Sequence, residues 1–280
     1  MPHPMTIEPI LRNALLEDLG HGNDVTSENI IPPNAQATAV MHARARGVIA
    51  GTRIAEMVFQ MVDPDLKTNR YVTSGESVLK NKELLSIQGS AQSILAAERV
   101  ALNFISHLSG VATATAAYVK EVKGTKAQIC CTRKTLPGIR SLQKYAVLAG
   151  GGANHRFGLD DAILIKDNHI AIAGGIQAAL DNAQNHSGHM MKIEIEVDTL
   201  EQLDEVLKHG GADVVMLDNM SAKTLRKAIK IIDGALITEA SGGITLENVS
   251  EIAQTGVNFI SIGALTHSVI GLDIGLDINT

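Results

Sequence analysis

Acidic and basic side chains recur at the ends of short aliphatic runs in the second half of this 280-residue chain. Lys166 ends one run, Glu196 the next and Asp218 the one after that. Carboxylate oxygens suit Mg²⁺ held partly by substrate oxygens, and a buried carboxylate pair needs a compensating cation. Glu194 faces the same way as Glu196 in a strand, so the pattern alone does not choose between them. A structural salt bridge is the alternative for these acids.

Two loops of small residues follow the last two aliphatic runs and predict phosphate binding. Ser241, Gly242 and Gly243 precede a helix expected to begin near Thr245, so backbone N–H groups and a helix amino terminus would face an anion. The second loop is formed by Ile262, Gly263 and Ala264, with His267 shortly after it. Barrel enzymes frequently hold phosphate between their final loops. Ordinary glycine turns are the alternative.

A basic island lies between residues 122 and 159, where the chain has no Asp or Glu. Its cations are Lys123, Lys126, Arg133, Lys134, Arg140, Lys144 and Arg156. The island carries +7 in a chain of net charge −6, so the remainder carries −13. This contrast favours a small, highly anionic ligand, with a solvated basic face as the alternative. Arginine forks bind carboxylates bidentately, and lysines supply point charge to phosphates.

A regular alternation of strands and helices must position these groups from residue 127 onward. Six β-branched or aliphatic runs predict strands at 127–132, 162–166, 192–197, 213–218, 235–240 and 258–263. Amphipathic segments between most of them predict helices at 176–183, 200–208, 222–232 and 246–255, and Thr199, Ser221 and Thr245 stand at their N-caps. Functional groups at consecutive strand ends favour an α/β barrel of six to seven parallel strands over a doubly wound sheet.

The first 110 residues mix structural types and predict an α+β domain. Strands are expected within 37–50 and at 83–88, and a helix at 7–19. Residues 93–122 predict either one long helix or two helices with a break at Ser109 and Gly110. The uncharged stretch 100–119 is rich in alanine and small polar residues, which favours a buried helix or subunit interface over a membrane span.

Composition excludes several function classes. The chain is 45% hydrophobic and 19% charged, which is typical of a globular protein. The negative net charge, the 2% aromatic content and the lack of tryptophan argue against nucleic-acid binding. No basic segment leads into an apolar run at the amino terminus, so no secretory signal is expected and the protein is predicted to be cytoplasmic. The adjacent Cys130 and Cys131 are predicted to be unbridged strand residues, and His107 and His169 to be structural.

Several motifs together resemble the quinolinate phosphoribosyltransferase family. They comprise residues 97–103 (AERVALN), 132–135 (TRKT), 151–156 (GGANHR), 165–169 (IKDNH), 194–197 (EIEV), 217–219 (LDN) and 263–267 (GALTH). The resemblance is in register from about residue 10 to 275. It implies an amino-terminal open α/β sandwich domain over 1–110, with the tail 268–280 packed back on it, and a barrel-like domain over 111–267.

The resemblance also implies an activity and a set of site residues. The enzyme would transfer the phosphoribosyl group of phosphoribosyl pyrophosphate to quinolinate with loss of CO₂, giving nicotinate mononucleotide in NAD biosynthesis. The substrate-binding residues would be Arg99, Thr132, Arg133, Lys134, His155, Arg156 and Lys166. Arg99 would come from the second subunit of a homodimer with shared active sites, which could assemble further.

The same resemblance assigns the catalytic and phosphate-binding groups. The catalytic residues would be Lys134, Lys166, Glu196 and Asp218. Glu196 and Asp218 would serve the ribose hydroxyls and Mg²⁺, directly or through water or substrate, which resolves the choice between Glu194 and Glu196. The phosphate-binding residues would be Ser241, Gly242, Gly243, Ile262, Gly263, Ala264 and His267.

Three other functions are compatible with parts of this pattern. One is a related phosphoribosyltransferase of the type found with molybdenum-uptake genes. Another is a Schiff-base aldolase that uses Lys166 as its nucleophile, although this gives Arg133 and Lys134 no role. The third is a non-catalytic phosphate-binding module, which would not need Glu196 and Asp218 together with Lys166.

Overall fold

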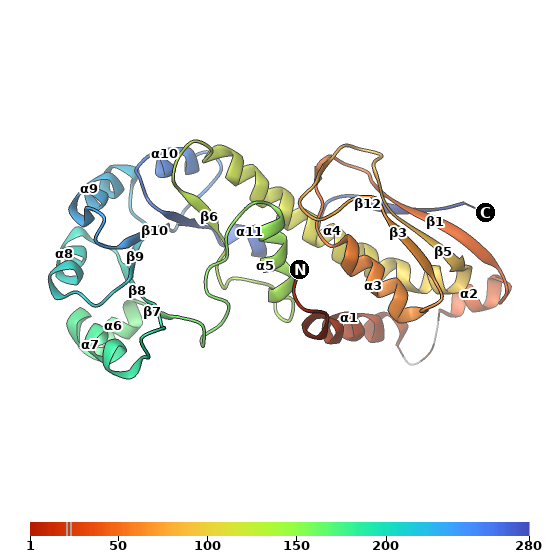
Figure 1. The fold of residues 1–280 in the computed structure, drawn as a ribbon, viewed down its shortest axis with the longest axis horizontal. Helices are drawn as coiled ribbons and strands as arrows, with labels where there is room; N and C mark the ends of the chain where they lie inside the picture. The colour runs from red at the N-terminus through yellow and green to blue at the C-terminus, as the bar shows by residue number, and fades with distance from the viewer. Residues whose placement is uncertain (21, 23, 280) are drawn as a thin grey trace. The chain divides into compact units, whose positions relative to one another are not determined.

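The computed structural model describes residues 1–20, 22 and 24–279 and divides the chain into two compact units (Figure 1). The first unit comprises Met1–Ala116, Thr135–Gly151 and Ala264–Thr280, and the second comprises Ala117–Lys134 and Gly152–Gly263. Residues 135–151 and 264–267, which the sequence placed with the barrel, therefore belong to the first unit. The reason is visible in buried Gln143, whose Nε2 donates to the carbonyl of Thr266 at 2.7 Å within that unit.

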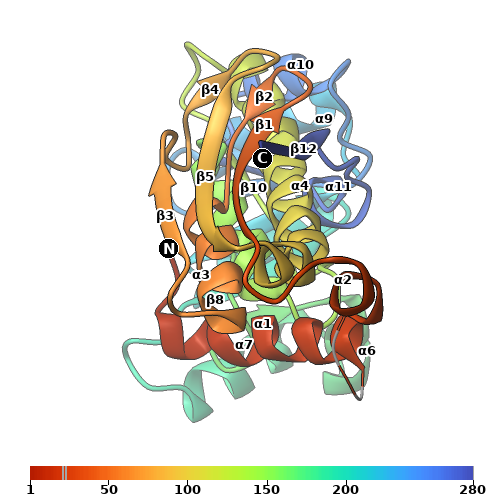
Figure 2. The same ribbon diagram turned by 90° about the vertical axis from the view of Figure 1, so that its right-hand side faces the viewer.

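The first unit is built around a four-stranded antiparallel sheet of order β12-β1-β5-β3. Its strands are β1 (Gln36–Ala43), β3 (Lys67–Arg70), β5 (Glu83–Ser90) and β12 (Ile274–Asn279), and β2 (Gly47–Val48) pairs with β4 (Ser77–Val78). Its helices are α1 (Pro4–Leu19), α2 (Val25–Ile30), α3 (Thr52–Val62), α5 (Arg140–Ala149), α11 (Ala264–His267) and most of α4 (Ala91–Glu121). Every second residue of β1 is buried, and α3 and α4 lie against the sheet (Figure 2).

Helix α4 is continuous, so the single long helix is the correct one of the two predicted alternatives, and there is no break at Ser109 and Gly110. The Ser109 Oγ accepts the N–H of Ala50 at 3.0 Å and lies 3.3 Å from its carbonyl, which satisfies a polar group inside the helix. A Cβ at Gly110 would lie 2.4 Å from the carbonyl oxygen of Ile270, so glycine serves close packing here. The helix is long and apolar enough to cross a membrane, but 56% of its apolar window is buried inside the protein, as the sequence predicted.

The second unit is an open barrel of six parallel strands in the order β6-β11-β10-β9-β8-β7, which confirms the predicted fold class. The strands are β6 (Gln128–Cys130), β7 (Ile163–Ile165), β8 (Ile193–Val197), β9 (Val214–Asp218), β10 (Ile237–Ser241) and β11 (Phe259–Ser261). Ala153 adds a single parallel bridge beside Cys130 at one edge. All six predicted strands are present, each within a few residues of its predicted limits.

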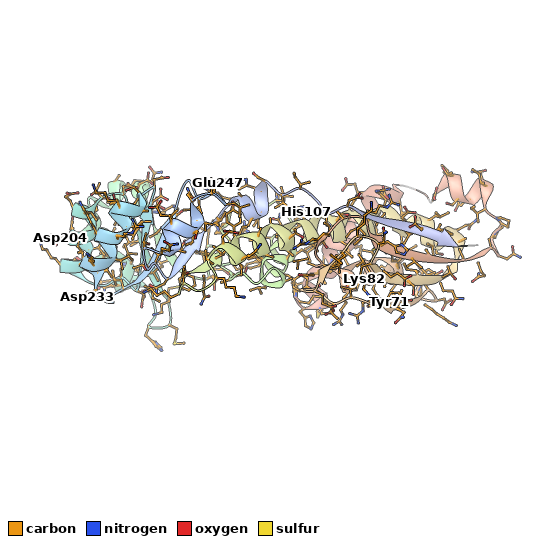
Figure 3. The ribbon with its side chains drawn as sticks, turned by 90° about the horizontal axis from the view of Figure 1, so that it is seen from above. Tyr71, Lys82, His107, Asp204, Asp233 and Glu247 are labelled. Atoms are coloured by element: carbon orange, nitrogen blue, oxygen red, sulfur yellow. The ribbon has the colours of Figure 1, made fainter. Side chains whose placement is uncertain are left out.

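Helices cover the outside of these strands (Figure 1). They are α6 (Asp167–Ala173), α7 (Ile176–His186), α8 (Leu200–His209), α9 (Ala222–Ile232) and α10 (Val249–Ala253). The N-caps predicted at Thr199 and Ser221 are confirmed, since each side chain accepts an N–H three residues later. Asp204 of α8 and Asp233, which ends α9, lie on the outer surface away from the strands (Figure 3).

Helix α10 begins later than predicted. The amide N–H of Thr245 donates to Asn248 Oδ1 at 2.8 Å, and Asn248 Nδ2 donates to the carbonyl of Gly243 at 2.9 Å. These bonds stabilise a turn over 243–248, so the helix starts only at Val249 and has five residues. The prediction that the helix starts near Thr245, with Thr245 as its N-cap, is therefore wrong.

Candidate active site

A cavity of about 400 Å³ opens at the carboxyl ends of the barrel strands. It is lined by Thr132, Arg133, Lys134, His155, Arg156, Leu164, Lys166, Glu196, Met216, Asp218, Glu239, Ser241 and Ser261. Nine of the predicted site residues are in this set. The parallel strands explain the gathering, because each one delivers the side chains at its end to the same side of the sheet.

Two arginines form the cationic wall of the cavity. One Nη atom of Arg156 donates to the carbonyl of Ala162 at 2.8 Å, which fixes the direction of the guanidinium. Burial and, after it, the neighbouring charge of Arg133 lower the pKa of Arg156. The Nε atom of Arg156 is buried and has no hydrogen-bond partner among the residues described. Two like charges held close together favour an anionic ligand between them.

Lys166 and the two predicted acids lie at adjoining strand ends. The Nζ atom of Lys166 bonds Glu196 Oε2, and the Lys166 amide N–H donates to the Nδ1 of His169 at 2.9 Å. His169 thus has the structural role expected of it, at the start of α6. Asp218 Oδ2 accepts from Asn219 Nδ2 at 2.5 Å. Oxygen donors are therefore present for a hard cation, but Glu196 already has a cationic partner.

The loop after β10 is shaped around Asn219. Gly242 has a φ of +86°, and a Cβ there would lie 2.1 Å from Asn219 Oδ1. The amide N–H of Asn219 donates to the carbonyl of Ser241 at 2.9 Å, with Asn219 itself at a φ of +52°. Glycine at 242 is therefore required by both conformation and space.

Ile262 differs from the other predicted phosphate-binding residues. Its side chain is buried, and its amide N–H donates to the carbonyl of Cys130 at 3.0 Å. Gly263 follows it as the last residue of the second unit, whereas Ala264 and His267 begin and end α11 in the first unit. Cys130 and Cys131 are buried, and neither forms a disulfide within the described part of the chain, as predicted.

The structure brings together a buried cluster that the sequence did not predict. It consists of His155, Glu194 and Glu239. The His155 Nε2 lies 3.0 Å from Glu194 Oε2 and 3.6 Å from Glu239 Oε1, and its Nδ1 accepts the amide N–H of Arg156 at 2.7 Å. These contacts define the ring as protonated on Nε2. Burial and, after it, the charge of Glu194 raise the pKa of Glu239 to about 7.

The structure separates Glu194 from Glu196 by depth. Both side chains come from the same face of β8, yet Glu194 is buried beside His155 whereas Glu196 is partly exposed beside Lys166. Strand alternation predicts that the two glutamates face the same side of the sheet, but it does not predict which of them lies at the cavity. Glu239 is an acidic residue inside an aliphatic strand run, and this signal in the sequence could have marked it as a candidate site residue.

Arg99 and part of the basic island lie in the first unit, not in the unit that contains the barrel cavity. Arg99 is exposed on α4 in the first unit, and no described residue forms an ion pair with it. The basic island does not form one patch, because Arg140 and Lys144 lie on α5 in the first unit whereas Arg133 and Arg156 line the barrel cavity. Sequence proximity was misleading here because the chain leaves the barrel at residue 135 and returns at 152.

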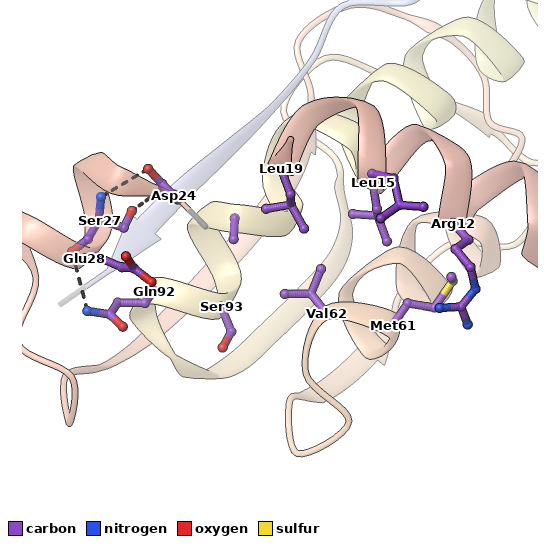
Figure 4. Close-up of a pocket in the computed structure, with 12 residues that line it drawn as sticks. Arg12, Leu15, Leu19, Asp24, Ser27, Glu28, Met61, Val62, Gln92 and Ser93 are labelled. Atoms are coloured by element: carbon purple, nitrogen blue, oxygen red, sulfur yellow. Dashed lines mark hydrogen bonds between the residues drawn. The ribbon is translucent and has the colours of Figure 1, made fainter. Parts of the chain in front are cut away.

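The first unit contains a cavity of about 380 Å³ between α1, α2, α3 and α4 (Figure 4). Leu15, Leu19 and Val62 form its apolar wall. Its polar groups have partners of their own: Asp24 caps α2 through the amide of Thr26 at 3.0 Å, and Gln92 Nε2 donates to the carbonyl of Ile31 at 2.8 Å. This arrangement stabilises helix ends and offers no clustered charge for chemistry.

Both parts of the chain match models of one protein family, and proteins of known sequence resemble the chain over nearly its full length. Residues 24–109 match the family described as the N-terminal domain of quinolinate phosphoribosyl transferase, and residues 111–277 match its C-terminal domain. A protein of Bacillus subtilis (strain 168), named a probable carboxylating nicotinate-nucleotide pyrophosphorylase, is 43% identical over 98% of this chain and 94% of its own length.

A plant relative and a solved structure agree. The decarboxylating quinolinate phosphoribosyltransferase 2b of Nicotiana tabacum, named as mitochondrial, is 43% identical over 99% of this chain and 84% of its own length. The crystal structure of nicotinate-nucleotide pyrophosphorylase from Ehrlichia chaffeensis is 42% identical and superposes with a TM-score of 0.93, covering 97% of this chain and 98% of that one.

Proposed function

This chain belongs to the quinolinate phosphoribosyltransferase family, and from that premise we propose how its barrel cavity performs the reaction. The enzyme transfers the phosphoribosyl group of phosphoribosyl pyrophosphate to quinolinate, with release of pyrophosphate and CO₂, and forms nicotinate mononucleotide for NAD biosynthesis. One observation carries the proposal: the cavity combines Arg133, Lys134, Arg156 and Lys166 with the carboxylates of Glu196 and Asp218. Such a site complements a dicarboxylate and a polyphosphate together.

The test is to measure nicotinate mononucleotide formation with quinolinate and with nicotinate as acceptor. We expect turnover with quinolinate only, because nicotinate lacks the second carboxylate that the arginines bind. Turnover with nicotinate at an equal rate would contradict the assignment of the acceptor. Borohydride trapping of a lysine adduct with a carbonyl substrate would instead support the Schiff-base aldolase, which the family membership does not favour. The same membership does not favour the molybdenum-linked paralogue.

In this proposal the arginine wall holds the quinolinate carboxylates. Arg133 and Arg156 bind them bidentately, and Lys166 adds a third cation. Thr132, Lys134 and His155 complete that side of the cavity, and Lys134 also faces the departing pyrophosphate. The two arginines repel each other electrostatically, and a bound dianion would relieve this repulsion, which supports the proposed role.

The acidic side of the cavity serves the ribose. Loss of pyrophosphate builds positive charge at the anomeric carbon, and Glu196 and Asp218 stabilise that charge electrostatically. Their oxygens also suit Mg²⁺, which supplies charge neutralisation for pyrophosphate when it is bound. Because Glu196 is paired with Lys166, we propose that these acids hold Mg²⁺ through water or substrate oxygens.

The 5′-phosphate is proposed to bind at the loops after β10 and β11. The residues that the second unit contributes are Ser241, Gly242, Gly243, Ile262 and Gly263. The positive φ values of Gly242 and Gly243 support this role, because successive amides in such a conformation form an anion-binding concavity. The N–H of Ile262 is already bonded, so Ile262 contributes by packing beneath the loop.

We further propose a cytoplasmic homodimer in which Arg99 completes the active site of the partner subunit. The exposed Arg99, without an ion-pair partner in the described part of the chain, supports this role. Mixing inactive Arg99→Ala subunits with inactive Lys166→Ala subunits is the test. Mixed dimers should regain one intact site of two. An active Arg99→Ala enzyme, or mixtures that stay inactive, would contradict the shared site.

A further inference from the structure

A second cavity, of about 340 Å³, lies at the opposite end of the barrel strands from the active-site cavity. Among the residues that line it are Ile163, Val214, Ile237 and Phe259, the first residues of β7, β9, β10 and β11. Three residues, His155, Arg156 and Glu239, line both cavities. The barrel interior is thus only one layer of side chains thick between the two spaces.

Glu239 is the acidic member of this shared layer. It is 4% exposed and lies in the middle of β10. Its Oε1 is buried, has no hydrogen-bond partner among the described residues, and lies 3.6 Å from His155 Nε2. Its Oε2 lies 4.0 Å from the Sγ of Cys130. Burial and the nearby carboxylate of Glu194 favour the neutral acid over the anion.

The proposed reaction needs a proton that none of its substrates supplies at the reacting carbon. When CO₂ leaves the ring, the carbon–carboxylate bond breaks and its electron pair stays on carbon 2, beside the cationic ring nitrogen. That carbon must then receive one proton to give nicotinate mononucleotide. Lys166 and the arginines are needed as cations for the substrate, so a neutral acid is the better source.

We propose that Glu239 donates this proton to carbon 2 and is reprotonated from water in the second cavity. The inference rests on the proposed function. The O–H bond of Glu239 breaks as the new C–H bond forms, and the resulting carboxylate takes a proton from the second cavity. Because that cavity lies on the other side of the layer, it stays accessible while substrates fill the first.

The surroundings of Glu239 agree with this role. Glu194 on β8 faces it and disfavours its anion, whereas His155, the hydroxyl of Ser261 and, more weakly, Lys166 favour the anion. Cys130 on β6 is the other titratable neighbour, Ser261 on β11 is polar, and Met216 is its register partner on β9. The balance leaves the pKa of Glu239 at about 7, near the ideal value for an acid that works at neutral pH.

The experiment separates the two chemical steps in the Glu239→Gln enzyme, with quinolinate labelled in its 2-carboxylate. In a single turnover, pyrophosphate release should stay within about threefold of the parent, while CO₂ and nicotinate mononucleotide should form about 10²-fold more slowly, the lower range for general acid catalysis. Quinolinate mononucleotide should accumulate. The parent's decarboxylation rate should fall as pH rises through about 7, and the variant should lose that dependence.

Equal losses in both steps would show a purely structural role and overturn the proposal. So would a selective loss of CO₂ release smaller than tenfold. If the Gln variant does not fold by circular dichroism, Glu239→Asp provides the same test, because it keeps a carboxyl group but withdraws it from carbon 2 by one methylene. A parent enzyme that fails to convert quinolinate would overturn the proposed function itself, which distinguishes the two failures.

Discussion

The two units each contain a cavity of similar size, about 400 Å³ in the barrel and about 380 Å³ in the first unit, yet their chemistry differs. In the first unit, Asp24 and Gln92 bond backbone groups, and Arg12 pairs with Glu8 at 2.7 Å. In the barrel, buried atoms of Arg156, Glu194 and Glu239 have no hydrogen-bond partner among the described residues. Cavity size therefore does not identify the active site, whereas incomplete pairing of buried charges does.

The backbone explains this difference. Antiparallel β1 alternates buried and exposed residues, so its polar side chains point to the outside of the sheet. The barrel strands are buried along most of their length, and their partly exposed polar residues Glu196, Asp218 and Ser241 lie at or next to their carboxyl ends. Charged side chains therefore gather at one end of the barrel sheet, whereas in the first unit they are spread over the outside of the sheet.

The largest effect should come from removing one arginine of the barrel cavity. Arg133→Ala or Arg156→Ala should weaken quinolinate binding by about 2–5 kcal/mol, because a bidentate pair is lost and the substrate carboxylate is left without its partner. Arg12→Ala is the matched control, since Arg12 lines the first-unit cavity and, among the described residues, forms its ion pair with the exposed Glu8. Isothermal titration with quinolinate measures all three variants.

The control should bind quinolinate as the parent does. Quinolinate affinity within twofold of the parent in either barrel variant would remove the arginine wall from the proposed site. Weakened binding in Arg12→Ala would show that quinolinate binding also depends on the first-unit cavity.

The next effect concerns the acidic side of the barrel cavity. The double variant Glu196→Gln, Asp218→Asn should lose about 10²–10³-fold in kcat, as expected when groups aimed at developing charge lose that charge. Thermal unfolding should change little, because both side chains are only partly buried and their amide isosteres keep the packing. Mg²⁺ titration of turnover gives the second readout. Full activity in this variant would assign the acids to structure alone.

The barrel strands and their ends were predicted well because these features depend on residues that are close together in the sequence. The strand runs, the N-caps at Thr199 and Ser221, and the position of Asp218 all depend on neighbours within a few residues. The start of α10 was mispredicted because Asn248 bonds back to Gly243, a side-chain contact that competes with the helix.

The rest depended on contacts between distant parts of the chain. His155, Glu194 and Glu239 come from three different segments, and only the folded barrel sheet brings them together. The division of the basic island depended on α5 packing in the first unit, which no local pattern of charge indicates. Residue types therefore predicted which side chains line the barrel cavity more completely than they predicted how deeply each side chain is buried.

A smaller effect should follow from adding one methyl group to the barrel's glycine loop. Gly242→Ala should lower the free energy of unfolding by about 1–3 kcal/mol, since a left-handed conformation is strained for alanine and the Cβ would meet Asn219 at 2.1 Å. Gly243→Ala is the matched control, with a φ of +62° and no heavy atom within 4 Å of its Cβ. Chemical denaturation and the KM for phosphoribosyl pyrophosphate are the measurements. An equal cost at the two positions would mean that Asn219 does not restrict the loop.

The smallest effect should come from the first-unit cavity, at the N-cap of α2. Asp24 accepts the amides of Thr26 and Ser27 at 3.0 and 3.1 Å, and its carboxylate also bonds the Ser27 hydroxyl. Asp24→Ala should therefore lower the free energy of unfolding by about 1 kcal/mol, while quinolinate turnover stays unchanged. The hydrogen bonds from Ser27 hold the pKa of Asp24 below its usual value of 3.8.

The sign of its pH dependence follows from that lowered pKa. A carboxyl group whose folded pKa is depressed stabilises the protein above its unfolded pKa, and this contribution is lost as pH falls through the folded value. The difference between parent and Asp24→Ala should therefore be constant at neutral pH and shrink below about pH 4. Asp24→Asn is the control, because asparagine caps nearly as well but does not titrate in this range. Urea unfolding at pH 7 and pH 3 measures both variants. A gap between parent and alanine variant that widens toward pH 3 would contradict the capping role, because protonation should weaken the parent's cap.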